Sequence, residues 1–522
     1  MKTLAFLLFF LFPGIMAGCQ DYAKGYVFED SDGDGVMDRR EKGIPGVAVS
    51  DGENIAVTDA SGYYELKVRD HCVIFVIKPK GYMTPVDGNN LPQGYYIHKP
   101  DGSPASEHPG SQPTGDLPEK LNFPLLKYDD PEKFSFFAFG DSQPYSLEHL
   151  DYFHRGIVND AKTRTEGISF GITLGDVVGD HLNLQPEYAK VMKEMGLPWY
   201  NVIGNHDRNL DSKDERFSNE TFESNFGPST FAFRYGDTHF IIIDNILRVS
   251  PEKASPYKGG FSEEQFTFLE NYMELVGEDD LIIVSYHIPI AYHEKQFIDK
   301  HRRRFFDILK GHKVLGLSAH THIQMQFAIG SEYGWEGDGP YREYNVGTTN
   351  GDWYSGEIDP KTNLPDATMR DGTPPGYAIV DVDGNNYSFR YKVAGKDEDF
   401  QMSVYGPEVV GRGQKGFPIY ANFFIGAPDD TVEFRIDGGE WKKMKRTENE
   451  VDPTFANKIY EWDRTTEKFM GRRPTSVPLY STHLWKGALD PTLPPGEHRV
   501  EIRAVDMFGN EHYGEHTYTV IE

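Results

Sequence analysis

The sequence has few cysteines and few basic residues for its length. Its 522 residues include two cysteines, and 53 lysines and arginines stand against 81 acidic residues, for a formal net charge of −28. A surface of this charge repels polyanions, so nucleic acid is not expected as a partner. Cys72 lies in the apolar run 72–77, so we expect a buried core thiol. No segment after the N-terminal one is long and apolar enough to span a membrane.

The first 18 residues resemble a signal peptide. Lys2 gives a positive start, residues 4–12 are apolar, and residues 17–18 are small. Small residues directly before Cys19 also resemble the bacterial lipoprotein cleavage site, in which Cys19 carries the lipid and no intramolecular disulfide is possible. Met16 is less usual than Leu in that site, which leaves ordinary cleavage open. We expect an extracytoplasmic protein of the bacterial periplasm or cell surface, membrane-bound through a lipid anchor or not at all.

The chain divides into three regions that differ in sequence pattern. Its length also predicts more than one hydrophobic core, and so more than one domain. Residues 21–128 contain short β-like runs separated by Gly, Pro and Asp, which predicts a small N-terminal β module with a loop at 100–118. Residues 131–395 alternate apolar strands with helical segments, which indicates an α/β domain. Residues 403–522 return to β texture and predict a C-terminal β domain.

The central region repeats one arrangement five times: an apolar strand ends, and side chains that can bind a metal follow at once. The five loops are residues 140–143, 175–180, 204–207, 287 and 318–322. Because ligands bind beyond the carboxyl ends of strands in α/β sheets, we expect these loops to converge on one site. Carboxylates, amide oxygens and imidazoles without thiolates suit divalent Mn, Fe, Zn or Mg.

These five motifs resemble those of the calcineurin-like metallophosphoesterase superfamily, whose pattern is D-x-H, G-D-x-x, G-N-H-D/E, a lone His and G-H-x-H. The resemblance spans residues 134–393 and includes all five motifs in order. It implies an α/β sandwich of two packed sheets flanked by helices, and hydrolysis of phosphate esters by a hydroxide that two metal ions activate. Gln143 departs from the commoner His, and Ala319 from the commoner Gly; neither change removes the bridging carboxylate.

The resemblance also implies a role for each motif residue. One ion would be held by Asp141, Gln143, Asp176 and His322. Asp176 would bridge to a second ion, held also by Asn205, His287 and His320. His206 would protonate the leaving alkoxide or stabilise the charge on it, with Asp207 as its orienter, whereas Asp180 receives no metal.

Each of these residues has a simpler interpretation when taken alone. Asp141 would be a turn residue, Asn205 a left-handed turn residue, and His287 a hydrogen-bonded core histidine. We prefer the joint interpretation because the simpler ones must be invoked independently at every motif. Three further residues are candidates for substrate contact, with core packing as the alternative for each: Arg208, two residues after His206, and the neighbours Trp353 and Tyr354.

Residues 30–41 fit the twelve-position calcium loop D-x-D-x-D-G-x5-E. The oxygen ligands would come from Asp30, Asp32, Asp34, Val36, Asp38 and Glu41. The flanking segments are β-like, so the module resembles the calcium-binding B-type repeat of surface adhesins, a small β-sandwich, more than an EF-hand pair. A solvated acidic loop is the alternative.

A β module before and another after the central domain resembles a bacterial secreted group of metallophosphoesterases with companion domains. We therefore expect a monomeric hydrolase of small phosphorylated substrates, acting on monoesters or diesters. The alternative is a surface binding lipoprotein whose central domain has lost activity and serves as a scaffold.

Overall fold

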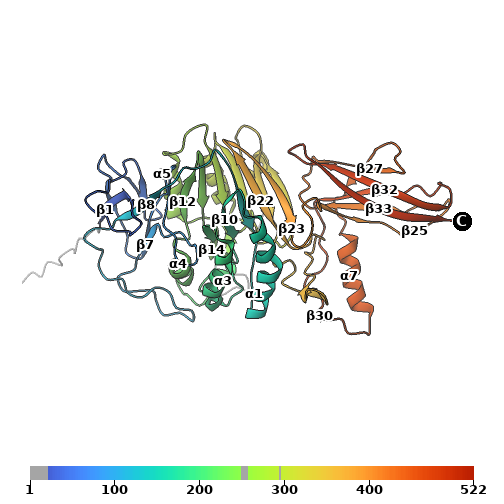
Figure 1. Ribbon diagram of the computed structural model, residues 1–522, viewed down its shortest axis with the longest axis horizontal. Coiled ribbons are helices and arrows are strands. Elements are labelled where there is room, and N and C mark those ends of the chain that lie inside the picture. Colours follow the sequence, from blue (N-terminus) through green and yellow to red (C-terminus); the bar gives the residue numbers. More distant parts are fainter. Residues whose placement is uncertain (1–21, 249–256, 293–295) are drawn as a thin grey trace, which may run out of the picture.

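The computed structural model describes residues 22–248, 257–292 and 296–522, so Cys19 and the expected signal peptide lie outside the described residues. Three domains follow one another along the long axis of the molecule, from the blue N-terminal module through the green and yellow central domain to the red C-terminal domain (Figure 1). Among the described residues, no helix combines the length and apolar character needed to cross a membrane.

The N-terminal module is a β-sandwich, as predicted. One sheet has the order β4-β1-β8-β6, formed by Tyr63–Lys67, Tyr22–Glu29, Phe123–Lys127 and Tyr82–Met83. The other has the order β3-β2-β5-β7, formed by Ile55–Val57, Ala48–Ser50, Cys72–Val76 and Tyr95–His98. Apolar side chains of both sheets, among them Val49, Ile74 and Leu125, form its core. Cys72 is buried in this core as a free thiol.

Two sheets form the centre of the middle domain. The first has the order β11-β10-β9-β22-β23, formed by Trp199–Val202, Ile168–Leu174, Lys133–Phe139, Gly376–Asp383 and Asn386–Val393. The second has the order β12-β13-β16-β17-β19-β18, formed by Phe231–Tyr235, Thr238–Ile242, Leu281–Ser285, Lys313–Ser318, Tyr341–Val346 and Gln324–Ile329. Strands β9, β10 and β11 run parallel, and so do β16 and β17, so their carboxyl ends lie at the same edge of each sheet.

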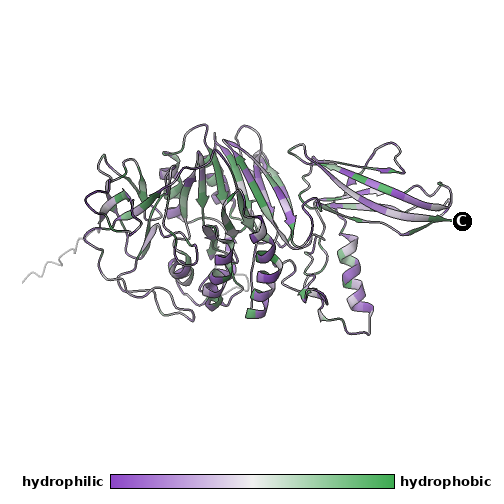
Figure 2. Cartoon of the chain, in the orientation of Figure 1, coloured by the Kyte–Doolittle hydropathy of each residue, from purple (hydrophilic) through white to green (hydrophobic). Residues whose placement is uncertain are grey.

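The alternation of side chains along β9 explains the layers of this domain. Phe134 and Phe136 pack in the core shared with the second sheet, whereas Phe137 and Phe139 pack with helix α1 on the outer side. Helices α5 and α6 cover the outer face of the second sheet. The α helices of the domain are α1 Leu147–Phe153, α2 Asn159–Ala161, α3 Gln185–Met192, α4 Glu220–Phe226, α5 Glu263–Met273 and α6 Asp299–Leu309. Hydrophobic residues accordingly concentrate on the central strands (Figure 2), and the predicted two-sheet α/β sandwich is confirmed.

The C-terminal domain again pairs two sheets. One has the order β24-β26-β31-β29, formed by Met402–Tyr405, Pro418–Phe423, Leu484–Ala488 and Lys445–Arg446. The other has the order β25-β33-β32-β27-β28, formed by Val409–Gly411, Glu511–Ile521, Gly496–Val505, Thr431–Ile436 and Lys442–Lys443. Helix α7 (Pro453–Arg464) projects from this domain, and β30 (Gly471–Arg472) returns to pair with β20 (Gly356–Asp359), whose other neighbour is β21 (Leu364–Pro365).

Buried polar contacts join each companion domain to the central one. Lys99 Nζ of the N-terminal module lies 2.7 Å from Glu220 Oε2 and 2.8 Å from Glu223 Oε2 on α4. His483 Nε2 of the C-terminal domain lies 3.0 Å from Asp371 Oδ2. Since an unpaired buried charge is costly, these pairs favour one fixed placement of the three domains.

Candidate metal centre

The five predicted loops meet at the carboxyl ends of the parallel strands. The loops follow β9, β10, β11, β16 and β17, and they carry Asp141, Gln143, Asp176, Asn205, His287, His320 and His322. Six of these side chains are buried, and His320 is half-buried. Segments as far apart in the sequence as residues 141 and 322 are therefore brought into contact.

The first group of predicted ligands is Asp141, Gln143, Asp176 and His322. Asp141 Oδ2 lies 3.2 Å from His322 Nε2, and this buried oxygen has no hydrogen-bond partner among the described residues. Gln143 Nε2 lies 3.3 Å from Asp176 Oδ2. A 180° turn of the Gln143 side-chain amide exchanges its nitrogen and oxygen. The oxygen, which is the atom that can bind a metal, then faces the same point. A buried carboxylate oxygen without a donor fits a site built for a cation.

The second group centres on His287. Its Nε2 lies 3.2 Å from Asp176 Oδ2, 3.1 Å from Asn205 Oδ1 and 3.1 Å from His320 Nδ1. Asp176, His287 and His320 each offer a ligand atom, and these atoms all lie within 4.8 Å of one another. Asp176 takes part in both groups, as a bridging carboxylate must.

Backbone carbonyls orient two of the imidazoles. His287 Nδ1 lies 2.9 Å from the Leu174 carbonyl oxygen, and His322 Nδ1 lies 3.0 Å from the Gly351 carbonyl oxygen. Each carbonyl holds a proton on Nδ1 and leaves Nε2 facing the centre. Histidine ligands in metalloproteins are fixed in this way.

Close approach of the loops depends on glycine and on unusual backbone angles. A Cβ on Gly204 would lie 2.0 Å from the Asp176 amide nitrogen, so only glycine fits there. Asp176, His320 and His322 have φ angles of 46°, 72° and 54°, in the left-handed region that non-glycine residues seldom adopt. Such strain is concentrated at functional sites, where the surrounding structure maintains it.

The charges at the centre suit a divalent cation. Burial alone would raise the pKa of Asp176, but the neighbouring His287 and His206 hold it well below its usual range. Burial, with the nearby His287, lowers the pKa of His320 to about 3. At neutral pH these residues are a carboxylate and a neutral imidazole, the forms that bind metals.

Asp180, which sequence analysis left without a role, pairs with the predicted acid His206. Its Oδ1 lies 2.7 Å from His206 Nδ1, and the His206 backbone N–H donates to Asp176 Oδ1 over 2.8 Å. Although burial opposes it, the charges of Asp176 and Asp180 raise the pKa of His206 to about 9. His206 thus carries a proton at neutral pH. Asp180 lies four residues after Asp176 in the same motif, and this position was the sequence signal that could have pointed to its role.

Asp207 does not orient His206, and that prediction is wrong. Its buried carboxylate accepts bonds from the backbone N–H groups of Val177 (3.0 Å), Val178 (3.0 Å) and Gly204 (2.8 Å). With three donors at its oxygens, it joins the second and third loops to each other. Asp207 therefore positions loops, and Asp180 takes the orienting role.

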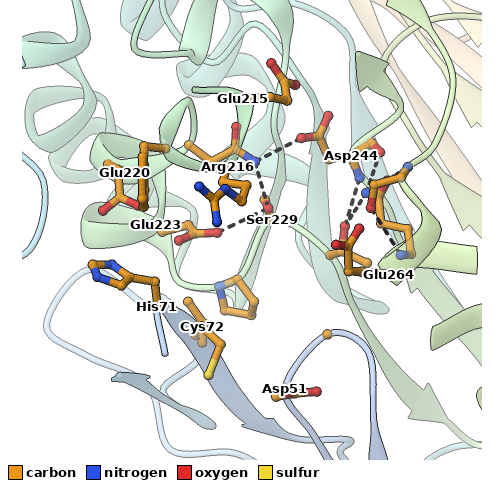
Figure 3. Close-up of a pocket in the computed structure, with 18 of the residues that line it drawn as sticks. Asp51, His71, Cys72, Glu215, Arg216, Glu220, Glu223, Ser229, Asp244 and Glu264 are labelled. Carbon is orange, nitrogen blue, oxygen red and sulfur yellow. Dashed lines mark hydrogen bonds between the residues drawn. The ribbon is translucent and has the colours of Figure 1, made fainter. Parts of the chain in front are cut away.

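Arg208 is not placed for substrate contact, which corrects a second prediction. Its guanidinium is buried and pairs with Asp244 over 2.9 Å and with Glu215. These side chains line a cavity of about 500 Å³ between the N-terminal module and the central domain (Figure 3), and no predicted metal ligand lines it. The two carboxylates fix Arg208 away from the metal centre.

Trp353 and Tyr354 have different surroundings. The Trp353 indole stacks on the His322 imidazole, with ring centroids 3.9 Å apart and planes 21° from parallel, and it is half-buried. Tyr354 is buried, and its hydroxyl donates to the Ser142 carbonyl. Tyr354 therefore supports the first ligand loop by packing, the alternative that the sequence left open, and of these two residues Trp353 is the one that borders the centre.

The acidic loop of the N-terminal module brings three of its six predicted ligands together: Asp30, Asp32 and Glu41 offer oxygens within 4.8 Å of one another. Asp38 instead pairs with Arg40 over 3.0 Å, and Asp34 accepts a bond from the Val36 backbone N–H. The structure thus supports a smaller set of carboxylates around one point than the twelve-position pattern predicts.

Comparison with known proteins gives three family matches in order along the chain. They are the N terminal of calcineurin-like phosphoesterase at residues 32–108, calcineurin-like phosphoesterase at 134–324, and the C terminal of calcineurin-like phosphoesterase at 343–512. No curated protein sequence matches the chain.

Solved structures give weak likenesses. Purple acid phosphatase PPD1 from yellow lupin (Lupinus luteus) seeds is 10% identical over 67% of this chain and 69% of its own, with a TM-score of 0.35. A hypothetical protein from Thermus thermophilus is 12% identical over 50% of this chain and 99% of its own, with a TM-score of 0.28. At these TM-scores neither likeness carries an argument. The three family matches do, and the chain belongs to the calcineurin-like phosphoesterases that carry N- and C-terminal companion domains.

Proposed function

We propose that this protein hydrolyses phosphate esters at a two-metal centre outside the cytoplasm. One observation carries the proposal: seven side chains of ligand type, from five separate loops, converge with Asp176 shared between two groups. The donor set of carboxylate and amide oxygens with imidazoles fits two divalent ions such as Mn, Fe, Zn or Mg. Monoesters and diesters both remain candidate substrates.

The metal ions, when bound, would polarise the phosphoryl oxygens and activate the attacking water. Asp141, Gln143, Asp176 and His322 would hold one ion. Asp176, Asn205, His287 and His320 would hold the other.

The residues of the chain itself supply the proton and the orientation. His206 delivers its proton to the leaving alkoxide, which converts a poor leaving group into an alcohol. Asp180 and Asp176 fix the ring and the backbone of His206, so the proton is delivered from one position.

The test is metal analysis together with hydrolysis of p-nitrophenyl phosphate and bis-p-nitrophenyl phosphate, after loading with Mn or Zn. We expect two ions per wild-type chain, and less than one in Asp176→Asn. His206→Ala should retain both ions and lose turnover about 10²- to 10⁴-fold. Protein that holds its metal and cleaves neither ester would favour the scaffold alternative.

We also propose that the protein is monomeric, acts on small phosphorylated substrates and reaches the cell surface or periplasm through its N-terminal segment. The support is the sequence alone: a signal-like segment with Cys19 behind it, and a net charge of −28 that disfavours nucleic acid. Labelling with radioactive palmitate should mark the wild type and not Cys19→Ala. Equal labelling of the two proteins would remove the lipid anchor.

A further inference from the structure

Three aromatic side chains border the metal centre, each against a different histidine. Trp353 stacks on His322, and the Tyr145 ring lies 6.0 Å from the His206 ring at 75°. Tyr257, at the start of β15 (Tyr257–Gly259, paired with β14, Ile246–Arg248), lies 6.2 Å from the His320 ring at 76°. All three side chains are half-buried, so each keeps part of its surface open to solvent.

Tyr145, Tyr257 and Trp353 are not among the seven predicted metal ligands. Each of the three rings lies against a histidine at the border of the centre. Flat apolar faces beside the reaction centre are suited to holding a ring of the substrate.

The C-terminal domain adds one positive charge to this border. Strand β30 pairs with β20, with Arg472 opposite Gly356, and the Arg472 guanidinium donates to the Trp353 carbonyl. Arg472 is exposed, and no carboxylate of the described residues pairs with it. The adjacent Arg473 differs, because Asp463 pairs with it over 2.7 Å. On a protein of net charge −28, an arginine without a carboxylate partner beside the centre is available to an anion.

We propose that Tyr145, Tyr257 and Trp353 hold the alcohol part of the ester, and that Arg472 binds a negative charge on it. The substrate class is then a phosphate ester of a ring-containing, anionic alcohol, whether an aryl or a sugar derivative. This inference rests on the proposed function, since the ester must sit with its phosphoryl group at the metal centre. It assigns the C-terminal domain a part in choosing the substrate.

The test compares three synthetic esters: ethyl phosphate, phenyl phosphate and 4-carboxyphenyl phosphate. The three esters differ in intrinsic reactivity, and this difference is the same for every variant. Comparing the ratio of kcat/KM for two esters between variants therefore cancels it. Arg472→Gln should lower the ratio of 4-carboxyphenyl to phenyl phosphate about 10-fold, mainly through KM, because a charge-assisted hydrogen bond is lost. Trp353→Ala should lower the ratio of phenyl to ethyl phosphate, and Trp353→Phe should restore much of it. Arg473→Gln is the matched control and should leave both ratios unchanged.

Binding of phosphonates gives a readout that does not need turnover. Calorimetry with Mn-loaded protein should show tighter binding of 4-carboxyphenylphosphonate than of phenylphosphonate, and of phenylphosphonate than of methylphosphonate. Metal content must be measured in each variant, because Trp353 rests on His322. If no ester is cleaved but these preferences persist and depend on Arg472 and Trp353, the proposed function fails and the recognition surface stands. If the variants leave the ester ratios and the phosphonate preferences as in wild type, the recognition surface is overturned whether or not the enzyme is active.

Discussion

The carboxylate of Asp180 lies 2.7 Å from Nδ1 of His206, the residue that we propose as the general acid. The two residues come from the second and third ligand loops, 26 positions apart. Their contact keeps a proton on Nδ1, so Nε2 is the nitrogen that can face a leaving group. In the proposed reaction, Asp180 therefore orients the acid and is not a metal ligand.

Asp180→Asn should therefore lower turnover of p-nitrophenyl phosphate about 10- to 100-fold, the usual effect of losing a carboxylate that orients a histidine. Metal content should stay at the wild-type value, measured by mass spectrometry of the same sample. Asp211→Asn is the matched control, because that exposed carboxylate bonds Ser106 and the Glu107 backbone instead. Wild-type turnover in Asp180→Asn would contradict the orienting role.

Lys99→Met should destabilise the protein by about 3–5 kcal/mol, because Glu220 and Glu223 would be left without their buried partner. Denaturant unfolding and limited proteolysis of the N-terminal module would measure the effect. The triple variant Lys99→Met, Glu220→Gln, Glu223→Gln removes all three charges and should regain most of the loss. An unchanged unfolding midpoint for Lys99→Met would show that the packing of the N-terminal module on the central domain does not depend on this contact.

Stability should fall as the pH is lowered from about 6.5 to 4, in part through His239. Burial, with the charge of Arg234, lowers the pKa of His239 to about 4, whereas an unfolded histidine titrates near 6.5. Between these two pKa values the histidine is protonated in the unfolded chain and neutral in the folded chain. The contribution of His239 to the free energy of unfolding is therefore fully present above pH 6.5 and is lost progressively as the pH falls to about 4. His239→Gln should reduce the decline by up to about 3 kcal/mol. Parallel stability curves for the two proteins would refute this assignment.

Calcium should raise the melting temperature of the wild-type protein relative to the protein in EGTA, through the oxygens of Asp30, Asp32 and Glu41. Asp32→Asn should abolish the increase. Asp38→Asn should preserve it, because Asp38 already pairs with Arg40. No calcium effect in wild type would leave this segment as a solvated acidic loop.

The convergence of the candidate metal centre could be predicted from the sequence because each candidate ligand lies in the loop that follows a strand. The strand fixes where its last residue lies, and the parallel order of β9, β10 and β11 brings their ends together. Local pattern and site geometry coincide at Asp141, Asp176 and His287. The two-sheet fold follows from the same strands.

Side-chain directions within the loops could not be predicted in this way. Arg208 follows the short helical turn Asn205–Asp207 with φ −100° and ψ 149°, and this extended backbone sends it toward Asp244, away from His206. Trp353 and Tyr354 share nearly the same φ, 51° and 52°, yet one borders the centre and the other packs beneath it. Such outcomes depend on partners distant in sequence, which no local pattern reports.

The pairing of β30 with β20 has a practical consequence for anyone who seeks a minimal enzyme. A fragment ending at residue 395 would keep every predicted metal ligand and still lack Arg472, together with the strand that steadies the backbone next to Trp353. On the recognition surface proposed above, such a fragment would lose the contact to the anionic group of the substrate, and it would also expose the buried cluster that continues from the central strands into the C-terminal domain. In that proposal, substrate selectivity is shared across a domain boundary.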